Sequence, residues 1–380
     1  MRVDDRTGAG ISSNGLTAVF AGPLVFVVVP LITFVAAGLT AHRSGSLGVD
    51  LDAYVLGAQR ILDGASPYDI RLLRETLHAG GHGVITPAYP PGTLLAFAPF
   101  TVLPHAVGLA AFIVFGLVCL LAVPRVLGSR DVRCSLAMLL SGGALAGVIL
   151  GSVSPLITLA VAVLWRVRDR DVAAAACVAV LIAAKLLFWP LALWLLLRGR
   201  LRAFAIAITV AALLLVASFA PVGMDGAREY ATVVRLIAQI QQTDGFSVIA
   251  YVHAAGFSVA AGSLVTVLLA GMLAWRAVAA QRRGDELACF TCMLALVLVA
   301  SPIVWTHYLP ILFVPLVLRA PRLDRRWLVI VPLAPVMTSS TIDLPFLLPL
   351  VAVFLAGFAV AMRGTPAARS PVSALAEPAA

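Results

Sequence analysis

The sequence predicts an all-α protein that crosses a membrane many times, and two observations carry this prediction. The chain of 380 residues is 61% hydrophobic, with a mean hydropathy of +1.03, so most of its surface must be solvated by lipid. Its basic residues stand between the apolar runs and form no stripe, a pattern typical of membrane topology and not of nucleic-acid binding. A β-barrel would show short alternating segments instead. We expect about 12 spanning helices, contact with membrane lipids and no nucleic-acid partner.

The spans can be placed in order along the chain. The first apolar run is too long for the core of a signal peptide, which predicts a retained membrane anchor. Later runs are separated by arginines, by prolines and by short polar turns. The predicted spans lie at about 17–40, 104–124, 135–150, 153–166, 172–185, 186–198, 203–220, 255–275, 286–302, 304–318, 327–340 and 344–362.

Arginines are dense in alternate gaps between these spans, for example at Arg198 and Arg200. The positive-inside rule places such gaps in the cytoplasm. Both termini are then cytoplasmic, and the protein belongs in the plasma membrane. The predicted organisation is a cytoplasmic tail over residues 1–15, a transmembrane domain over 16–362 and a disordered cytoplasmic tail over 363–380.

The first outer loop, residues 41–103, is long and rich in carboxylates and tyrosines. Its segment LDAYVLGAQRILDG has apolar residues at helical spacing, which predicts a helix on the membrane surface that ends at Gly64. Its segment AYPPGTLLAFAPF is interrupted by proline and too short to span, so we expect a re-entrant or interfacial element. Carboxylates at the mouth of a membrane protein are costly unless water, a partner or a substrate meets them.

Three polar residues stand out at the predicted outer face. Lys185, the only lysine of the chain, interrupts an apolar run; it is either a functional cation or a side chain that extends to the lipid headgroups. Asp50 is either the N-cap of the surface helix or a proton acceptor. His307 is either a packing residue or an anion contact. Asp52 cannot share a helical face with Asp50, so the two carboxylates should not act as a dyad.

Four blocks of the chain resemble glycosyltransferase family 87, the polyprenyl-phosphate-mannose-dependent α-(1→2) mannosyltransferases. The resemblance implies a GT-C fold with a long first extracytoplasmic loop. The chain departs from the family at Tyr308, where a second histidine is common, and at the turn 151–154, Gly-Ser-Val-Ser, where Gly-Gln-x-Asn is frequent. The four blocks are VDLDAYVLGAQRILDG with a following YD, AYPPGTLLAFAPF, AAKLLFWPLALWLLLRGR and SPIVWTHYLPIL.

The resemblance also implies roles for single residues. Asp50 matches the aspartate that would accept the proton of the acceptor hydroxyl. Lys185 and His307 match residues that would hold the donor phosphate. The substrate pocket is expected to include Asp52, Tyr54, Tyr89, Pro90, Pro91 and Trp305.

Glycosyl transfer at the outer face needs an activated donor that crosses the bilayer, and a lipid-linked sugar phosphate is one. The phosphate is already a good leaving group, so cations suffice and no metal or other cofactor is expected. The expected reaction is inverting transfer of mannose, in α linkage, from a polyprenyl-phosphate donor to a cell-envelope glycolipid or polysaccharide. A polyprenyl-phosphate-arabinose-dependent arabinofuranosyltransferase is the alternative within this class.

Two other classes of protein remain open. A transporter or lipid flippase would place ionisable residues deep within several spans and would show an internal repeat, whereas the charges here collect at one face. A non-catalytic scaffold for envelope assembly is supported only by the altered turn at residues 151–154.

Overall fold

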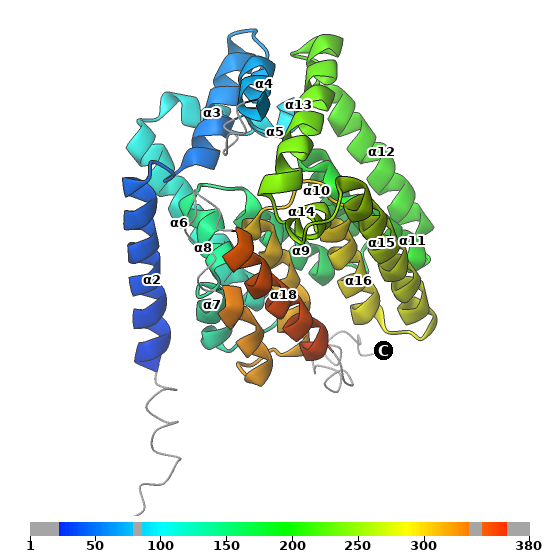
Figure 1. The fold of residues 1–380 in the computed structure, drawn as a ribbon. Coiled ribbons are helices and arrows are strands. Elements are labelled where there is room, and N and C mark those ends of the chain that lie inside the picture. The colour runs from blue at the N-terminus through cyan, green and yellow to red at the C-terminus, as the bar shows by residue number, and fades with distance from the viewer. Residues whose placement is uncertain (1–22, 79–85, 334–343, 363–380) are drawn as a thin grey trace, which may run out of the picture.

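The computed structural model describes residues 23–78, 86–333 and 344–362 (Figure 1). Every regular element in these ranges is a helix, which confirms the predicted all-α class. The predicted tails, residues 1–15 and 363–380, lie outside the described residues. The elements are α2 (Pro23–Arg43), α3 (Val49–Leu62), α4 (Ile70–His78), α5 (Pro91–Leu95), η1 (Ala98–Val102), α6 (His105–Val126), α7 (Val132–Met138), α8 (Gly142–Ile149), α9 (Ser154–Val167), α10 (Asp171–Ala184), η2 (Leu186–Phe188), α11 (Pro190–Leu197), α12 (Leu201–Ser218), α13 (Gly223–Asp244), α14 (Val248–Ala254), α15 (Val259–Arg282), α16 (Glu286–Val299), η3 (Thr306–Leu312), α17 (Phe313–Arg319), η4 (Arg325–Leu333) and α18 (Leu344–Ala361).

Three helices of the described part are long and apolar enough to cross a membrane, namely α6, α12 and α15. The helices α7 and α8 add a fourth crossing if they form one span, which is bent by 72°. Shorter apolar helices, among them α9, α10 and α16, occupy other predicted spans. The chain is therefore a membrane protein, while the count of about 12 spans and the GT-C arrangement stay predictions.

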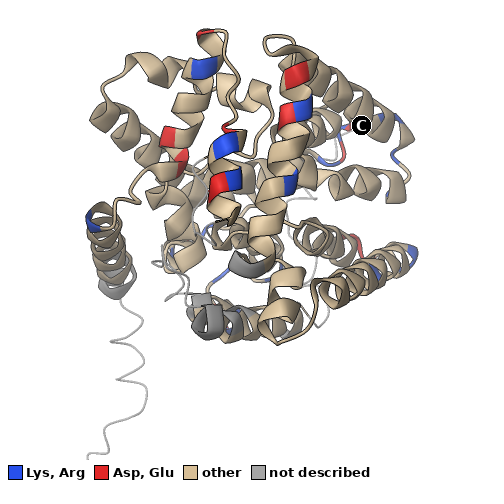
Figure 2. Cartoon of the chain, turned by 45° about the horizontal axis from the view of Figure 1, so that its top comes forward, with Lys and Arg blue, Asp and Glu red and all other residues tan. Residues whose placement is uncertain are grey.

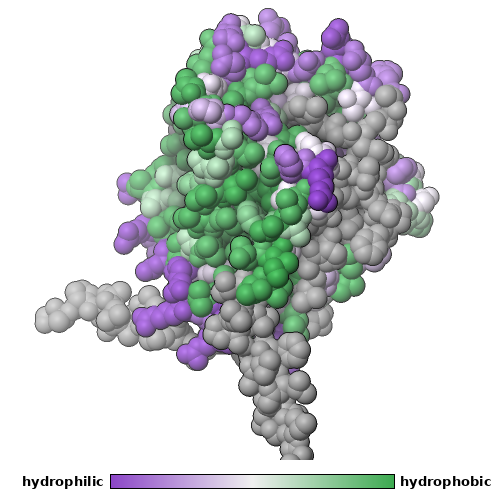
Figure 3. Space-filling model, turned by 90° about the vertical axis from the view of Figure 1, so that its left-hand side faces the viewer, coloured by the Kyte–Doolittle hydropathy of each residue, from purple (hydrophilic) through white to green (hydrophobic). Residues whose placement is uncertain are grey.

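The surface of the molecule agrees with contact to lipid. Apolar residues fill the middle of the face in Figure 3, with hydrophilic residues above and below them. Of the most apolar stretch of α15, 11% is buried within the molecule. Val267 and Leu268 of α15 and Leu213 of α12 are exposed, and such side chains cost little where hydrocarbon surrounds them.

Two long loops predicted to be outer, the first over residues 41–103 and a second over about 221–254, fold into helices at one end of the bundle, the upper end in Figure 1. In the first loop the predicted helix forms as α3, and Gly64 follows it at a φ of 74°. Its predicted placement on the membrane surface is wrong, because its apolar face, with Leu51, Tyr54 and Ile61, is buried against α5 and η1. The Pro-interrupted segment forms only α5 and η1, both too short to span. The second loop forms α13, a helix of 22 residues that packs against α4. Figure 2 shows charged residues on α13 and on the first loop.

A junction of backbone groups fixes α3 to the bundle. The N–H groups of Gly48 and Asp50 donate to the carbonyls of Ile149 and Leu150, at 3.0 and 2.9 Å, where α8 ends. The first N–H groups of a helix have no partner within it, so α8 supplies acceptors that α3 would otherwise lack. Gly151 follows at a φ of 70°, and a Cβ there would lie 2.7 Å from the Cβ of Leu51.

Small residues on α8 also let η3 approach closely. A Cβ at Gly143 would lie 2.5 Å from the backbone oxygen of Thr306, and one at Gly147 would lie 3.4 Å from the Cβ of His307. Glycine removes the side chain that would hold these backbones apart. The helix α8 thus carries α3 on its C-terminal end and η3 along its side.

We predict that Gly143→Ala destabilises the protein by about 1–3 kcal/mol, because the added methyl must displace the backbone at Thr306. Thermal unfolding in detergent measures the effect. Gly271→Ala is the matched control, since nothing lies within 4 Å of a Cβ at that helical position. Equal melting temperatures for Gly143→Ala and the wild type would contradict the close contact between α8 and η3.

Candidate functional site

Asp50 is the second residue of α3 and turns toward the bundle. The N-cap of α3 is Gly48, without a side-chain capping bond, so the helix-capping interpretation of Asp50 is wrong. The Tyr54 hydroxyl lies 3.5 Å from Asp50 Oδ2, at the outer limit of a hydrogen bond. The Asp50 side chain is 27% exposed. The carboxylate therefore lies at the edge of the interior, where water reaches one side of it.

The segment around α5 brings Tyr89 to the same place. Tyr89 is buried, and its hydroxyl lies 3.4 Å from the Tyr54 hydroxyl. The Tyr68 hydroxyl donates to the backbone oxygen of Tyr89 at 2.8 Å, and Pro90 forms the N-cap of α5. Thr93 Oγ1 donates to the Ala184 carbonyl at 3.2 Å, which ties α5 to the end of α10. The Tyr-Pro-Pro element thus positions the Tyr89 phenol beside Lys185, the residue that follows Ala184.

Lys185 stands at the break between α10 and η2 and is 7% exposed. Its Nζ donates to the Tyr89 hydroxyl at 3.0 Å and lies 3.5 Å from the centre of the Tyr308 ring. Aromatic faces attract cations without neutralising them. Among the described residues, the Lys185 ammonium has one hydrogen-bond partner, Tyr89, although it carries three N–H donors. The side chain does not extend to the headgroups; it is a buried cation with donors to spare.

Trp305 and His307 complete the cluster from η3. His307 is 6% exposed, and its Nε2 lies 3.9 Å from Asp50 Oδ2, too far for a hydrogen bond. The rings of Trp305 and His307 are nearly parallel, at 8°, with centres 6.4 Å apart. Tyr308 packs edge-on against His307 at 4.9 Å. One segment therefore supplies an imidazole facing the carboxylate and a phenol facing the ammonium.

Burial tunes the carboxyl group of Asp50, which belongs to the first loop and not to a predicted span. Burial raises its pKa to about 6, because the charged form loses hydration. A hydrogen bond from Ser152, the charge of Lys185 and a hydrogen bond from Tyr54 act in the opposite direction, in that order. At pH 7 a group with this pKa is about 90% ionised. It is a carboxylate that can accept a proton near neutral pH.

Eight of the nine residues expected from the sequence lie in or beside this cluster, and they come from four separate segments. Pro91 is buried with its neighbours as the first residue of α5. Asp52 lies apart, because its side chain is 49% exposed and accepts a hydrogen bond of 2.8 Å from His105 Nε2 at the start of α6. The remaining expected residues, Asp50, Tyr54, Tyr89, Pro90, Lys185, Trp305 and His307, form the cluster and its supports.

Sequence reasoning missed two members of the cluster. Ser152 is 2% exposed and lies close enough to Asp50 to lower the pKa of that carboxyl group, and Tyr308 covers Lys185. In the sequence both stand at departures from the family pattern, Ser152 in the turn 151–154 and Tyr308 after the Trp-x-His block, and Ser152 also belongs to the polar residues of the predicted outer face. That signal could have found them, since a position where a family keeps polar groups is a position where the site needs them.

The space at the cluster is small in this conformation. Lys185, Tyr308 and Ser154 line a cavity of about 10 Å³, roughly the room for one water molecule. A sugar therefore requires the outer loops to move or binds at the exposed edge of Asp50. Within the described residues, no group of three His, Cys, Asp or Glu side chains is arranged to hold a metal ion.

The sequence of the chain matches a known protein family. The sequence profile of glycosyltransferase family 87 matches residues 88–302, more than half of the chain. The chain belongs to glycosyltransferase family 87. It is thus a membrane glycosyltransferase, which uses a sugar donor and an acceptor. No curated protein and no solved structure matches the chain.

The match to family 87 covers only part of the cluster. It includes Tyr89, Ser152 and Lys185, begins after Asp50 and ends before His307. The structure supplies the connection for the other two, since Asp50 Oδ2 faces His307 Nε2 and borders the bonded pair of tyrosines. The contacts therefore join residues within and outside the matched range into one candidate site in this family 87 protein, at the end of the bundle that carries α3, α4 and α13.

We predict that Asp50 is half-protonated near pH 6. The difference infrared spectrum between the wild type and Asp50→Asn, followed against pH, should show the protonated carboxyl band with that midpoint. Ser152→Ala should move the midpoint higher, because it removes a hydrogen bond that favours the charged form. Ser44→Ala, which removes a hydroxyl bonded to Ser46 and not to Asp50, should not. A midpoint near 4, the ordinary value for aspartate, would show that the group is not buried as described.

Proposed function

We propose that the protein transfers mannose, in α linkage and with inversion, from a polyprenyl-phosphate donor to a cell-envelope glycolipid or polysaccharide. The proposal rests on its membership of family 87 and on one observation. A carboxylate with a raised pKa faces a histidine and lies close to a buried lysine that keeps free donors. This arrangement has what such a transfer needs, a proton acceptor beside a cationic site for phosphate.

In the proposed reaction, the acceptor hydroxyl oxygen attacks the anomeric carbon of the donor. The bond from that carbon to the phosphate oxygen breaks, and polyprenyl phosphate leaves with the electron pair. Asp50 takes the proton of the acceptor hydroxyl. Charge develops on the departing phosphate in a transition state of oxocarbenium character, so a fixed cation stabilises it most when the bond is breaking.

Lys185 and His307 are the groups that we assign to the donor phosphate. Lys185 lies between two tyrosines and has donors left after its bond to Tyr89. A buried ammonium without a carboxylate bonded to it is costly unless an anion visits it. His307 Nε2 adds a ring nitrogen 3.9 Å from Asp50 Oδ2. No step in this scheme calls on a metal or another cofactor.

We place the site on the outer face of the plasma membrane, with both termini in the cytoplasm. The distribution of arginines supports this orientation. The helices α3, α4 and α13 lie together at the end of the bundle that carries the cluster, as expected of outer loops. A lipid-linked donor suits this side, because nucleotide sugars are confined to the cytoplasm.

We predict that Asp50→Asn lowers transfer by about 10²–10⁴-fold, because the amide cannot accept the proton. The assay follows radiolabelled mannose from polyprenyl-phosphate-mannose into endogenous glycolipid, in membranes that carry equal amounts of folded protein. Asp63→Asn is the matched control, since this carboxylate at the exposed end of α3 bonds only to Gln59 among the described residues.

The outcomes of this assay separate the alternatives. Equal labelling by the wild type and Asp50→Asn, above a vector control, would remove Asp50 from the mechanism and direct attention to Asp52. Labelling only with polyprenyl-phosphate-arabinose would replace mannose by arabinofuranose. A wild type that labels with neither donor, while Asp50→Asn still supports envelope assembly in cells, would favour the scaffold.

We predict that Lys185→Gln lowers kcat/KM for the donor by about 10²–10³-fold, the effect of losing one group that stabilises a developing charge. Lys185→Arg should not restore activity, because the cavity of about 10 Å³ beside the ammonium cannot take a planar guanidinium. Arg60→Gln, a change of charge at a partly exposed position of α3 in the first loop, serves as control. Near-normal kinetics for Lys185→Gln would contradict the phosphate assignment.

A further inference from the structure

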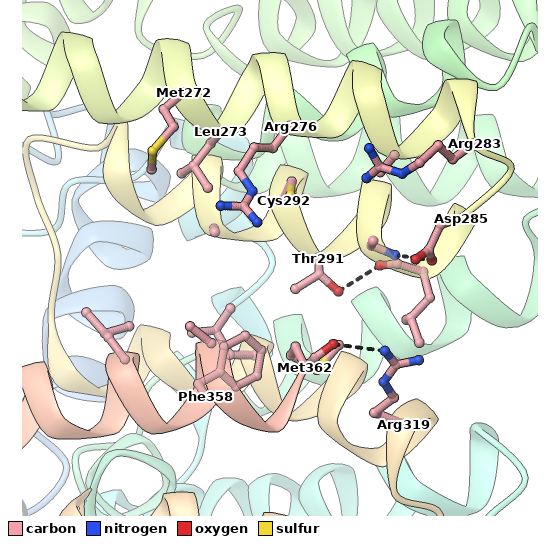
Figure 4. A pocket seen from close by; sticks show the side chains of 17 residues that line it. Met272, Leu273, Arg276, Arg283, Asp285, Thr291, Cys292, Arg319, Phe358 and Met362 are labelled. Carbon is pink, nitrogen blue, oxygen red and sulfur yellow. Dashed lines mark hydrogen bonds between the residues drawn. The ribbon is translucent and has the colours of Figure 1, made fainter. Parts of the chain in front are cut away.

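A second cavity lies between α15, α16, α17 and α18, away from the Asp50 cluster (Figure 4). Its volume is about 360 Å³, within the range of roughly 300–1,000 Å³ that small-molecule sites occupy. The site described above does not use it. Its lining is mainly apolar, and its polar groups are concentrated where α15 ends and α16 begins.

The apolar part of this cavity opens toward lipid. Met272 of α15 and Leu355 of α18 line it and are exposed, and Phe358 forms a buried wall between them. The helix α15 is the least buried of the three helices long enough to span a membrane in the described part. Trp275, one residue before the first basic residue of the lining, is 69% exposed. Tryptophan prefers the level of the lipid headgroups, so this end of the cavity lies near the membrane interface.

The polar part of the cavity is cationic. Arg276 and Arg283 extend into it from α15, and Arg319 borders it from α17, where its Nη2 donates to the Met362 carbonyl at 2.9 Å (Figure 4). Among the described residues of the lining, Asp285 is the only carboxylate, and it accepts from the Ala288 N–H as the N-cap of α16. Within the described residues, neither Arg276 nor Arg283 has an ion-pair partner.

Two arginines at other predicted cytoplasmic turns give a contrast. Arg168 and Arg198 both contact Glu286, at 3.1 and 2.7 Å, and both also pair with Asp169, so carboxylates of the protein balance their charges. Arg276 and Arg283 instead flank an open space whose far part is hydrocarbon. A ligand that satisfies both parts carries an anionic head and an apolar chain.

We propose that this cavity binds an anionic diacyl phospholipid from the inner leaflet. The phosphate contacts Arg276 and Arg283, and one acyl chain lies along Met272 and Phe358 toward the middle of the membrane. Basic pockets between membrane helices on the cytoplasmic side bind such headgroups. The charge of the lining selects an anionic lipid over a zwitterionic one, and the apolar part selects a lipid over a free phosphate.

The test is native mass spectrometry of the intact protein in detergent, titrated with dioleoyl-phosphatidylglycerol or dioleoyl-phosphatidylcholine. We expect phosphatidylglycerol to bind at least fivefold more tightly. The double variant Arg276→Gln/Arg283→Gln should weaken phosphatidylglycerol binding by roughly tenfold to thirtyfold. Arg282→Gln is the matched control, because Arg282 borders a separate groove on α15 and not this cavity. Ala359→Trp, which fills the apolar part, should also weaken binding.

Several results would overturn the proposal. Equal affinity for the two lipids, or equal loss in Arg282→Gln and the double variant, would show that no specific site exists. Displacement of phosphatidylglycerol by glycerol 3-phosphate at matched concentration would assign the cavity to a free phosphate compound. Preferential displacement by polyprenyl phosphate would assign it to the carrier lipid. The proposal does not depend on which sugar the enzyme transfers.

Discussion

The C-terminal carbonyls of α8 hold the N-terminus of α3, and the geometry of the site depends on this contact. Ile149 and Leu150 accept hydrogen bonds from the first N–H groups of a helix that would otherwise have to find a side-chain cap. Because the backbone is satisfied by the bundle, the side chain of Asp50 is left free to face inward. The helix α8 also packs against η3 through its glycines. It therefore sets the distance between the Asp50 carboxylate and the His307 imidazole.

The burial of the Lys185 ammonium depends on a second set of contacts. Lys185 is bonded to a phenol and covered by a second aromatic ring, contacts that lower the cost of burial without cancelling the charge. A bonded carboxylate would hold the ammonium more firmly, but it would compete with any anionic ligand. The tyrosines therefore keep the cation available, and Asp50, at the edge of the cluster, keeps its access to water.

Much of the architecture could be read from the sequence, because apolar runs bounded by arginines reflect local physics. The predicted span at 203–220 is α12, and the helix predicted in the first loop is α3, although its apolar face packs on the protein and not on the membrane. The helix α13 was not predicted. It has a polar face and an apolar face and packs on another loop and not on lipid, so no continuous apolar run marks it in the sequence. The break at Lys185 was predicted, since the spans at 172–185 and 186–198 meet there and α10 ends at Ala184.

The candidate site, too, could be predicted only in part. Asp50, Lys185 and His307 were found from their cost in an apolar chain and from a resemblance, while their mutual distances were not predictable. The pairing of Asp52 with His105 lies across 53 residues of sequence and leaves no local pattern. Ser152 was visible only as an unusual turn, since its bond to Asp50 requires the junction between α3 and α8.

Having only one lysine gives the protein a chemical reporter. Lys185 is the sole side-chain amine of the chain and is buried under aromatic rings. Reagents that acylate amines therefore have a single side chain to find, and they reach it only when the rings part. The extent of acylation then measures how often the centre of the enzyme opens, in the intact membrane and without any engineered label.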